Sequence, residues 1–258
     1  MLRMRSFSRR IRRGSVRLTL VTLTLALVST GVVVPGPPSP QISVDSLQLV
    51  APGQAAGVGW TRTIEPTSST ELVGVEWSGK RAGAVDVRVQ VDGRWLPWGV
   101  LRGKPDEGPD PGSAEHRNTT TAGPAWAGTG VERVQVRVAE GRLPNLRVHL
   151  IHSPRMPTSR IRSAAADPGW PGIISRAQWG ADEGIRNSSP GCEGEPKYAS
   201  TLNNSFVHHT VNINTYSGDQ AFELIRGIYA FHVQSNKWCD IGYNFIVDRF
   251  GRTFEGRY

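Results

Sequence analysis

The order of elements expected in residues 205–257 constrains the fold of this 258-residue chain more than any other feature. The letters FVHHTV predict a buried strand around two histidines. The apolar positions of this strand are Phe206, Val207 and Val211. Because side chains alternate between the faces of a strand, the imidazoles of His208 and His209 are expected to point in opposite directions. At most one of them is then expected to enter a given metal shell.

A helix is expected after this strand, because Ser217 and Gln220 have the spacing of a capping box. Its apolar stripe consists of Ala221, Leu224, Ile225, Ile228 and His232. His232 is therefore expected to face inward. Residues 243–248 predict a second strand, and Gly251 closes a short turn that favours a hairpin. The order strand, helix, strand favours a right-handed parallel crossover, with functional groups at the strand ends.

Five sequence blocks stand out in this part of the chain. They are SRAQWGAD at 175–182, FVHHT at 206–210, RGIYAFHVQ at 226–234, WCDIGYNF at 238–245 and FEGR at 254–257. Together they resemble the peptidoglycan recognition protein family, which shares its fold with zinc-dependent N-acetylmuramoyl-L-alanine amidases of type 2. The resemblance implies that residues 171–258 form the N-terminal part of an α/β amidase-like domain, with a mixed sheet and flanking helices. It implies zinc-dependent hydrolysis of the amide bond between N-acetylmuramoyl and L-alanine in cell-wall peptidoglycan, with peptidoglycan or muropeptide as the partner.

The resemblance also assigns roles to individual residues. His208 matches the first zinc ligand, and His209 is its neighbour outside the first shell. A catalytic zinc site holds three protein ligands and a water whose pKa falls to about 7, so that hydroxide is available at neutral pH. Tyr243 matches the residue that helps catalysis. Because a tyrosine with an ordinary pKa of about 10 is a poor base, we expect Tyr243 to orient the water or to donate a hydrogen bond to the oxyanion.

Further residues are assigned to substrate binding. Trp238, Asn244 and Arg257 match positions at or near the ligand groove, where an aromatic face, an amide and a guanidinium suit sugar, peptide and carboxylate groups. The alternative for these three is packing or a solvated surface. His209 and His232 are also placed in substrate binding, and core packing is the alternative for His232. The alternative for His208 is a hydrogen-bonded histidine in the core. The alternative for Tyr243 is an ordinary aromatic residue of a strand.

The family pattern continues beyond the EGR block, where later segments supply a second histidine and a cysteine or aspartate as zinc ligands. Since the sequence ends at Tyr258, we expect a C-terminally truncated fragment that lacks the distal ligands and is inactive alone. His209 or His232 could instead complete a metal site. The alternative function is a non-catalytic recognition module that binds peptidoglycan in the same groove. The residues beyond Tyr258 would discriminate between the enzyme and this module.

Cys192 and Cys239 are the only two cysteines, and they match a disulfide of related recognition proteins. The alternative, a pair of metal-binding thiolates, lacks the close spacing of a zinc motif. A disulfide favours an exported protein, secreted or held at the cell wall.

The first 34 residues have the layout of a signal peptide. Seven arginines within residues 1–17 precede an apolar run at 18–34, and no acidic residue occurs before Asp45. The run is near the lower limit for a membrane span, so an uncleaved anchor is the one membrane contact expected. Of 30 basic residues, 23 remain after removal of those seven arginines, against 22 acidic ones. This near balance gives no support for nucleic acid binding.

The middle of the chain differs in character. After a Pro-rich segment at 35–42, residues 43–153 contain runs that alternate apolar and polar residues, such as AVDVRVQV, and predict an all-β sandwich-like domain. Its Gly-rich and Pro-rich residues 103–123 predict a long loop. Residues 154–170 predict a linker to the amidase-like domain.

Two interpretations are open for four tryptophans, the core of the sandwich or a carbohydrate-stacking surface. These are Trp77, Trp95, Trp98 and Trp126.

Overall fold

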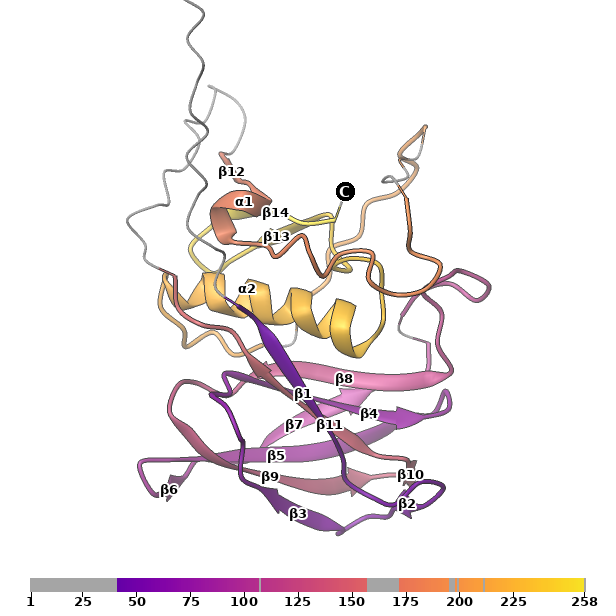
Figure 1. Cartoon of the computed structure of the whole chain (residues 1–258), viewed down its shortest axis with the longest axis vertical. Helices are drawn as coiled ribbons and strands as arrows, with labels where there is room; N and C mark the ends of the chain where they lie inside the picture. Colours follow the sequence, from indigo (N-terminus) through magenta and orange to yellow (C-terminus); the bar gives the residue numbers. More distant parts are fainter. Residues whose placement is uncertain are drawn as a thin grey trace, which may run out of the picture. The chain divides into compact units, whose positions relative to one another are not determined.

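The computed structural model shows a chain built mainly of β-strands with a few helices (Figure 1). The residues that it describes are 41–106, 108–156, 172–194, 198, 200–210 and 212–257. The predicted signal peptide at 1–34 lies outside the described residues. So do most of the Pro-rich segment at 35–42 and most of the linker at 154–170.

Two antiparallel sheets form the N-terminal sandwich, so the prediction of an all-β region is confirmed. The four-stranded sheet has the order β1 (Ser43–Gln48), β11 (Arg147–His152), β4 (Leu72–Ser78) and β8 (Thr119–Trp126). The five-stranded sheet has the order β3 (Thr61–Ile64), β9 (Val131–Glu140), β5 (Gly83–Val91) and β6 (Arg94–Trp95), and β7 (Gly99–Gly103) also pairs with β5. The short strands β2 (Ala55–Ala56) and β10 (Leu143–Pro144) pair with each other.

The alternation of apolar residues explains how the sheets pack. Along β5 and β9 the valines face one side, and they are paired across the two strands. The pairs are Val85 with Val138, Val87 with Val136, and Val89 with Val134. These valines are buried in one core with residues of β4 and β11. A period of two therefore places one face of each sheet in the shared core.

The core interpretation is confirmed for two of the four tryptophans, and the carbohydrate-stacking surface stays a prediction. Trp77 and Trp126 are buried, at 0% and 7% exposure, and therefore belong to the core. Trp95 and Trp98 are half-buried. The Arg88 guanidinium lies 4.7 Å from the ring centroid of Trp95 and 4.4 Å from that of Trp98, so these rings stack on a side chain of the same domain.

The predicted loop at 103–123 is shorter than expected, because β8 begins at Thr119. The sequence TTTAGPAW reads as a loop through its glycine and proline, yet its residues alternate in burial and pair with β4. The register between β4 and β8 shifts between Val73 and Val75, which accommodates Gly123 and Pro124 within the strand.

The described residues of the C-terminal region contain a small mixed sheet and three helical segments. The strands are β12 (Ile173–Ile174), β13 (Phe245–Val247) and β14 (Thr253–Glu255). The helical segments are α1 (Arg176–Trp179), α2 (Gln220–Ala230) and the π-helix η2 (Phe231–Ser235). Strand β14 pairs antiparallel with β13, which confirms the predicted hairpin, and parallel with β12. The complete α/β amidase-like fold stays a prediction.

The start of α2 follows the sequence pattern closely. The Ser217 backbone N–H donates to Gln220 Oε1 at 2.8 Å, and the Gln220 N–H donates to Ser217 Oγ at 3.3 Å, so the reciprocal bonds of the capping box are present. The predicted apolar stripe is buried, and His232, in η2, is 6% exposed. The inward orientation of His232 is thus confirmed.

The strand predicted for FVHHTV is not formed over its described residues, 206–210. The described residues 200–210 contain no strand, and Phe206 and Val207 are 88% and 104% exposed. A strand is stable only when its N–H and C=O groups pair with a neighbour, and none of the described strands pairs with this segment. The crossover expected between this segment and β13 is wrong for the same reason.

The sandwich and the C-terminal region share a second core. It contains Leu72 and Ile151 of the sandwich together with Phe222 and Ile228 of α2. Helix α2 approaches the sheet closely, because Gly227 has no side chain and a Cβ there would overlap Leu72. Figure 1 shows α2 between the sandwich and the β12–β14–β13 sheet.

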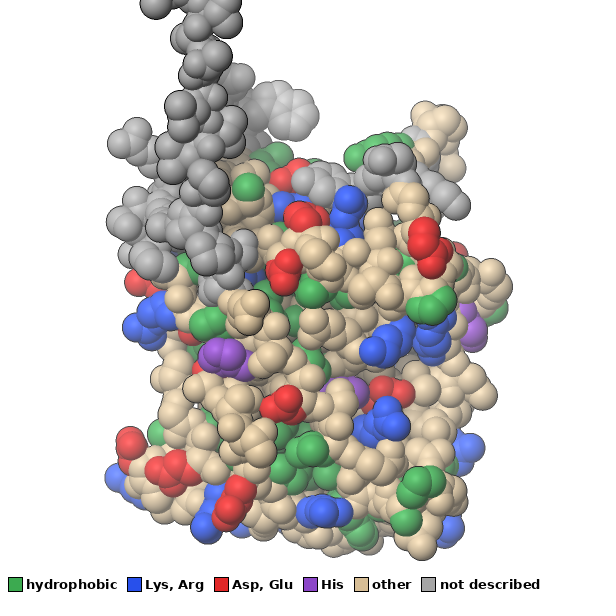
Figure 2. Space-filling view, viewed as in Figure 1, with side chains coloured by type: hydrophobic (Ala, Val, Ile, Leu, Met, Phe, Trp, Pro, Cys, Tyr) green, Lys and Arg blue, Asp and Glu red, His purple; other side chains and the backbone are tan. Residues whose placement is uncertain are grey.

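Basic and acidic side chains are interspersed on the described face shown in Figure 2. Among the helices of the described residues, none has the length and apolar character needed to cross a bilayer.

Candidate functional site

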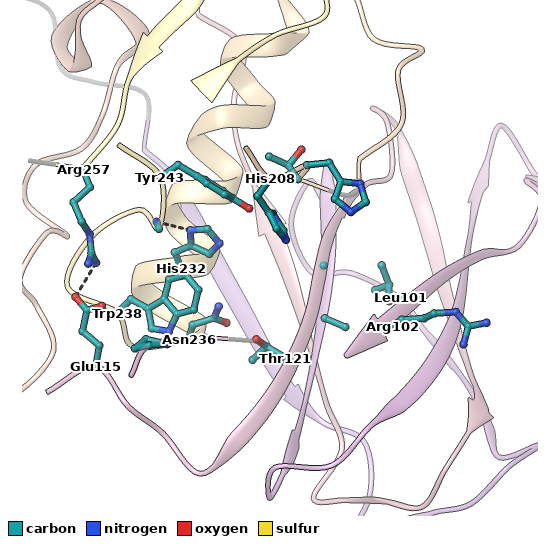
Figure 3. Close-up of a pocket in the computed structure, with 17 residues that line it drawn as sticks. Leu101, Arg102, Glu115, Thr121, His208, His232, Asn236, Trp238, Tyr243 and Arg257 are labelled. Atoms are coloured by element: carbon teal, nitrogen blue, oxygen red, sulfur yellow. Dashed lines mark hydrogen bonds and ion pairs between the residues drawn. The ribbon is translucent and has the colours of Figure 1, made fainter. Parts of the chain in front are cut away.

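A cavity of about 440 Å³ lies between the sandwich and the C-terminal region (Figure 3). One wall comes from the sandwich, from the end of β7, the loop that follows it, and β8. This wall includes Leu101, Pro109, Glu115, Thr121 and Ala122. The other wall contains six of the residues that the sequence singled out. These are His208, His209, His232, Trp238, Tyr243 and Arg257.

Aromatic rings dominate the C-terminal wall. The Tyr243 ring centroid lies 6.3 Å from that of His208, with an interplanar angle of 28°, and 5.7 Å from that of His232. The His232 ring in turn lies 4.4 Å from Trp238. The fold therefore brings residues from three separate segments into one aromatic row.

His208 and His209 lie side by side rather than back to back. Both are exposed, their ring centroids are 5.4 Å apart, and both line the cavity. A second cavity of about 360 Å³ is also lined by these two histidines and by Tyr243. The expectation that the two imidazoles point in opposite directions is wrong, because the segment is not a strand and its side chains are not held in alternation.

His232 is held as a neutral ring of one tautomer. The Gly242 backbone N–H donates to His232 Nδ1 at 3.0 Å, as the dashed line in Figure 3 shows, so Nδ1 is an acceptor. The neutral ring then carries its proton on Nε2, which is a donor. Burial, and secondarily the charge of Arg257, lower the pKa of His232 from 6.5 to about 3.

The lowered pKa of His232 predicts a dependence of stability on pH. Between pH 6.5 and about 3 the unfolded chain binds a proton that the folded chain does not, so the free energy of unfolding should fall as pH falls through this window. The expected slope from this residue is about 1.4 kcal/mol per pH unit. Urea unfolding at several pH values measures it. The His232→Asn variant should show a flatter profile over this window, and an unchanged profile would contradict the assignment.

Arg257 forms an ion pair with Glu115 of the sandwich. Its Nη2 donates to Glu115 Oε1 at 2.7 Å, and its Nε donates to the Ile241 carbonyl at 3.0 Å. Glu115 Oε1 also accepts from the Cys239 N–H at 3.0 Å. The Glu115 carboxylate is 14% exposed and the Arg257 side chain 30%, so the pair is partly shielded from water. The structure thus gives Arg257 a carboxylate partner within the chain.

Asn244 does not join the other predicted residues. It is exposed and lines neither of the two cavities described here, and its carbonyl accepts from the Gly256 N–H at 2.9 Å. Its role in substrate binding stays a prediction.

Cys192 and Cys239 are joined in a disulfide. The disulfide attaches the segment before residue 195 to the loop that carries Trp238.

The described residues do not by themselves fit a catalytic zinc. One group of three described side chains has ligand atoms close enough for one metal, and it consists of Glu115, Cys192 and Cys239. Both of its sulfurs are in the disulfide, so it is not a metal site. His208 and His209 form no such group with a third described residue. A catalytic zinc takes three protein ligands.

Comparison with known protein families identifies the N-terminal half. Residues 35–171, more than half of the 258 residues, match the family described as Rv3811 N-terminal galactose-binding domain-like. The chain belongs to this family. The sandwich is therefore its galactose-binding-like domain, and strands β1–β11 lie within the matched residues.

Curated relatives of the chain are peptidoglycan-recognition proteins. Peptidoglycan-recognition protein SC2 of Drosophila simulans is 31% identical over 85 residues, which are 33% of this chain and 42% of the relative. Peptidoglycan recognition protein 4 of Homo sapiens is 32% identical over 104 residues, which are 40% of this chain and 24% of the relative. The matched region thus spans less than half the length of these relatives.

Several cavity residues were not found from the sequence. Glu115 and Thr121 lie in the galactose-binding-like domain, and Glu115 is 142 residues from its partner Arg257, so no local pattern links them. Asn236 stands two positions before Trp238 and also lines the cavity. Its position close to the WCDIGYNF block was the one sequence feature that could have marked Asn236 as a site residue.

Proposed function

We propose that this chain recognises peptidoglycan, and that the 440 Å³ cavity is where it binds a muropeptide. The observation that carries this proposal is the convergence of six predicted site residues, from segments up to about 50 residues apart, on one cavity. Its volume lies in the usual range for small-molecule sites, and its mixture of aromatic rings and a few polar groups is typical of them. The names of the curated relatives support the same class of ligand.

Each part of the C-terminal wall has a role in this proposal. Trp238 offers an aromatic face to a sugar or an aliphatic side chain. His232 offers an Nε2–H donor whose protonation does not change near neutral pH, because the pKa of the ring lies at about 3. His208, His209 and Tyr243 line both cavities, so further parts of a branched ligand would lie against them.

The protein as it exists should bind muramyl tripeptide in isothermal titration calorimetry. Trp238→Ala is expected to weaken binding about tenfold or more, since aromatic anchors carry much of the affinity of a site. Tyr198→Ala is the matched control, because Tyr198 is 74% exposed and lines neither cavity. Equal affinities of wild type and Trp238→Ala would place binding elsewhere, and absence of binding by the wild type would refute the proposal.

Zinc-dependent N-acetylmuramoyl-L-alanine amidase activity is the second candidate function. It is favoured by the stacking of Tyr243 on His208, the two residues that the family resemblance assigns to catalysis and to zinc. This function requires zinc ligands besides the described residues, so we derive no hydrolytic step from them. Replacement of His208 by Ala should lower zinc content and muramyl-peptide cleavage, whereas His209→Ala should preserve the zinc content. Unchanged zinc and turnover in His208→Ala would reject the assignment.

The proposal also places the protein outside the cytoplasm, secreted or at the cell wall. The Cys192–Cys239 disulfide fits an oxidising compartment, where such bonds persist.

A further inference from the structure

We infer that Glu115 of the galactose-binding-like domain binds a primary ammonium group of the ligand, so that both halves of the chain contact the muropeptide. This inference rests on the proposed function and deepens it. It names a charged group that the ligand carries and the side chain that recognises it.

The Glu115 carboxylate lines the cavity, and one of its two oxygens is unused. Its Oε1 accepts from Arg257 Nη2 at 2.7 Å and from the Cys239 N–H at 3.0 Å. No donor among the described residues bonds to its Oε2, although each carboxylate oxygen can accept about two hydrogen bonds. The side chain is 14% exposed, and Oε2 is not one of the occluded atoms without a partner. This oxygen is therefore accessible to a donor from outside the chain.

The position of Glu115 is fixed before any ligand binds. Its two bonds to Arg257 and Cys239 attach it to the C-terminal region. The backbone on both sides of it is held by the Arg117 guanidinium, whose Nη1 donates to the carbonyls of Ala114 at 2.7 Å and His116 at 2.8 Å. An acceptor that is already held in place loses little conformational freedom on binding.

The surroundings of the free oxygen suit a cation. Trp238 is half-buried, lines the same cavity and precedes Cys239, whose N–H donates to Glu115. Figure 3 shows the carboxylate and the indole next to each other. An ammonium group is attracted by the face of an aromatic ring and forms a charge-assisted hydrogen bond to a carboxylate. A carboxylate beside an indole therefore favours an ammonium over a neutral donor.

The two arginines of the cavity are each paired with a carboxylate. Arg102 pairs with Glu140, and Arg257 pairs with Glu115. Because Arg257 bonds to Oε1, an ammonium at Oε2 would share the carboxylate with it, and the negative charge would lie between the two cations. A muropeptide carries a primary ammonium group when its stem peptide contains a diamino acid.

Calorimetry of the full chain with two muramyl tripeptides tests the inference. One has lysine as its third residue, and the other has Nε-acetyllysine, which lacks the charge and keeps an N–H. The wild type is expected to bind the lysine form about tenfold more tightly. Glu115→Gln should bind both forms with equal affinity, since its amide oxygen can still accept from Arg257 and Cys239 but carries no charge. Glu132→Gln is the matched control, because Glu132 is a carboxylate of the same domain that lines neither cavity, and it should keep the tenfold preference.

The outcomes separate this inference from the proposed function. Equal affinity of the wild type for the two peptides would overturn the inference and leave the proposed function standing. An undiminished preference in Glu115→Gln would also overturn it, because the ammonium group would then bind elsewhere. Failure of the wild type to bind either peptide would overturn both. Thermal unfolding checks the fold of each variant, and the comparison of the two peptides on the wild type decides if Glu115→Gln does not fold.

Discussion

Replacement of Arg176 by Met is expected to lower the free energy of unfolding by about 3–5 kcal/mol. The Arg176 side chain is 1% exposed. Its Nη1 donates to Asp240 Oδ1 at 3.1 Å and to the Gly256 carbonyl at 2.8 Å, while its Nε donates to Glu183 Oε1 at 2.6 Å. It thus joins α1, the loop before β13 and the end of β14.

The large expected loss of stability arises because the substitution of Arg176 leaves the buried Asp240 carboxylate without its charged partner. Asp240 is 5% exposed, burial already raises its pKa, and Arg176 opposes that rise. Without the guanidinium, a buried carboxylate loses its charged partner. Urea unfolding of the full chain measures the loss, and Arg133→Met, which breaks an exposed ion pair with Glu65, should cost about 1 kcal/mol or less.

A double variant identifies the cause of the loss. Adding Asp240→Asn to Arg176→Met should restore part of the stability, because it removes the unpaired charge. A cost as small as that of Arg133→Met would show that Arg176 does not hold these segments together.

Loss of the Cys192–Cys239 disulfide is expected to lower the free energy of unfolding by on the order of 4 kcal/mol in the chain-entropy model. The two cysteines are separated by 47 residues, so the bond removes much freedom from the unfolded chain. The Cys192→Ser/Cys239→Ser double variant should show this loss in urea unfolding.

The same variant should also weaken muramyl tripeptide binding. Cys239 follows Trp238, and its N–H is held by Glu115, so a looser loop disturbs both walls of the cavity. Reductant should lower the stability of the wild type and leave the double variant unchanged. A wild type that is fully reduced by thiol titration yet equally stable would contradict the prediction.

Local patterns predicted the parts of this fold whose determinants are close in sequence. The capping box at Ser217 and Gln220, the buried stripe through His232 and the turn at Gly251 each depend on residues within a few positions, and the structure has all three. The alternating valines of β5 and β9 likewise indicated a two-layer β-structure.

Features that depend on distant partners were not predictable in this way. The FVHHTV segment has the alternation of a strand, but alternation does not supply the neighbour that a strand must pair with. TTTAGPAW has the glycine and proline of a loop, yet pairing with β4 makes it a strand. Glu115 lies in the galactose-binding-like domain and Arg257 in the C-terminal region. Because the sequence pattern of one region carries no information about the other, the contact between these two residues was not predictable.

One wall of the candidate site was predictable from the sequence, and the other was not. The family blocks pointed to one wall, in which His208, His232 and Tyr243 converge. The other wall belongs to the galactose-binding-like domain, and nothing in its sequence marks Thr121 or Glu115 as site residues. Asn244 was included because it lies in a matched block, although the hairpin places it outside the cavity.

Hydrogen-exchange mass spectrometry of the full chain, with and without muramyl tripeptide, tests the central claim most directly. Binding in the cavity between the galactose-binding-like domain and the C-terminal region predicts slower amide exchange in two separate stretches. These are residues 231–243 of the C-terminal region and residues 115–126 of the galactose-binding-like domain. Protection of the first stretch alone would confine the site to the C-terminal region. Unchanged exchange in both stretches at saturating ligand would contradict the account.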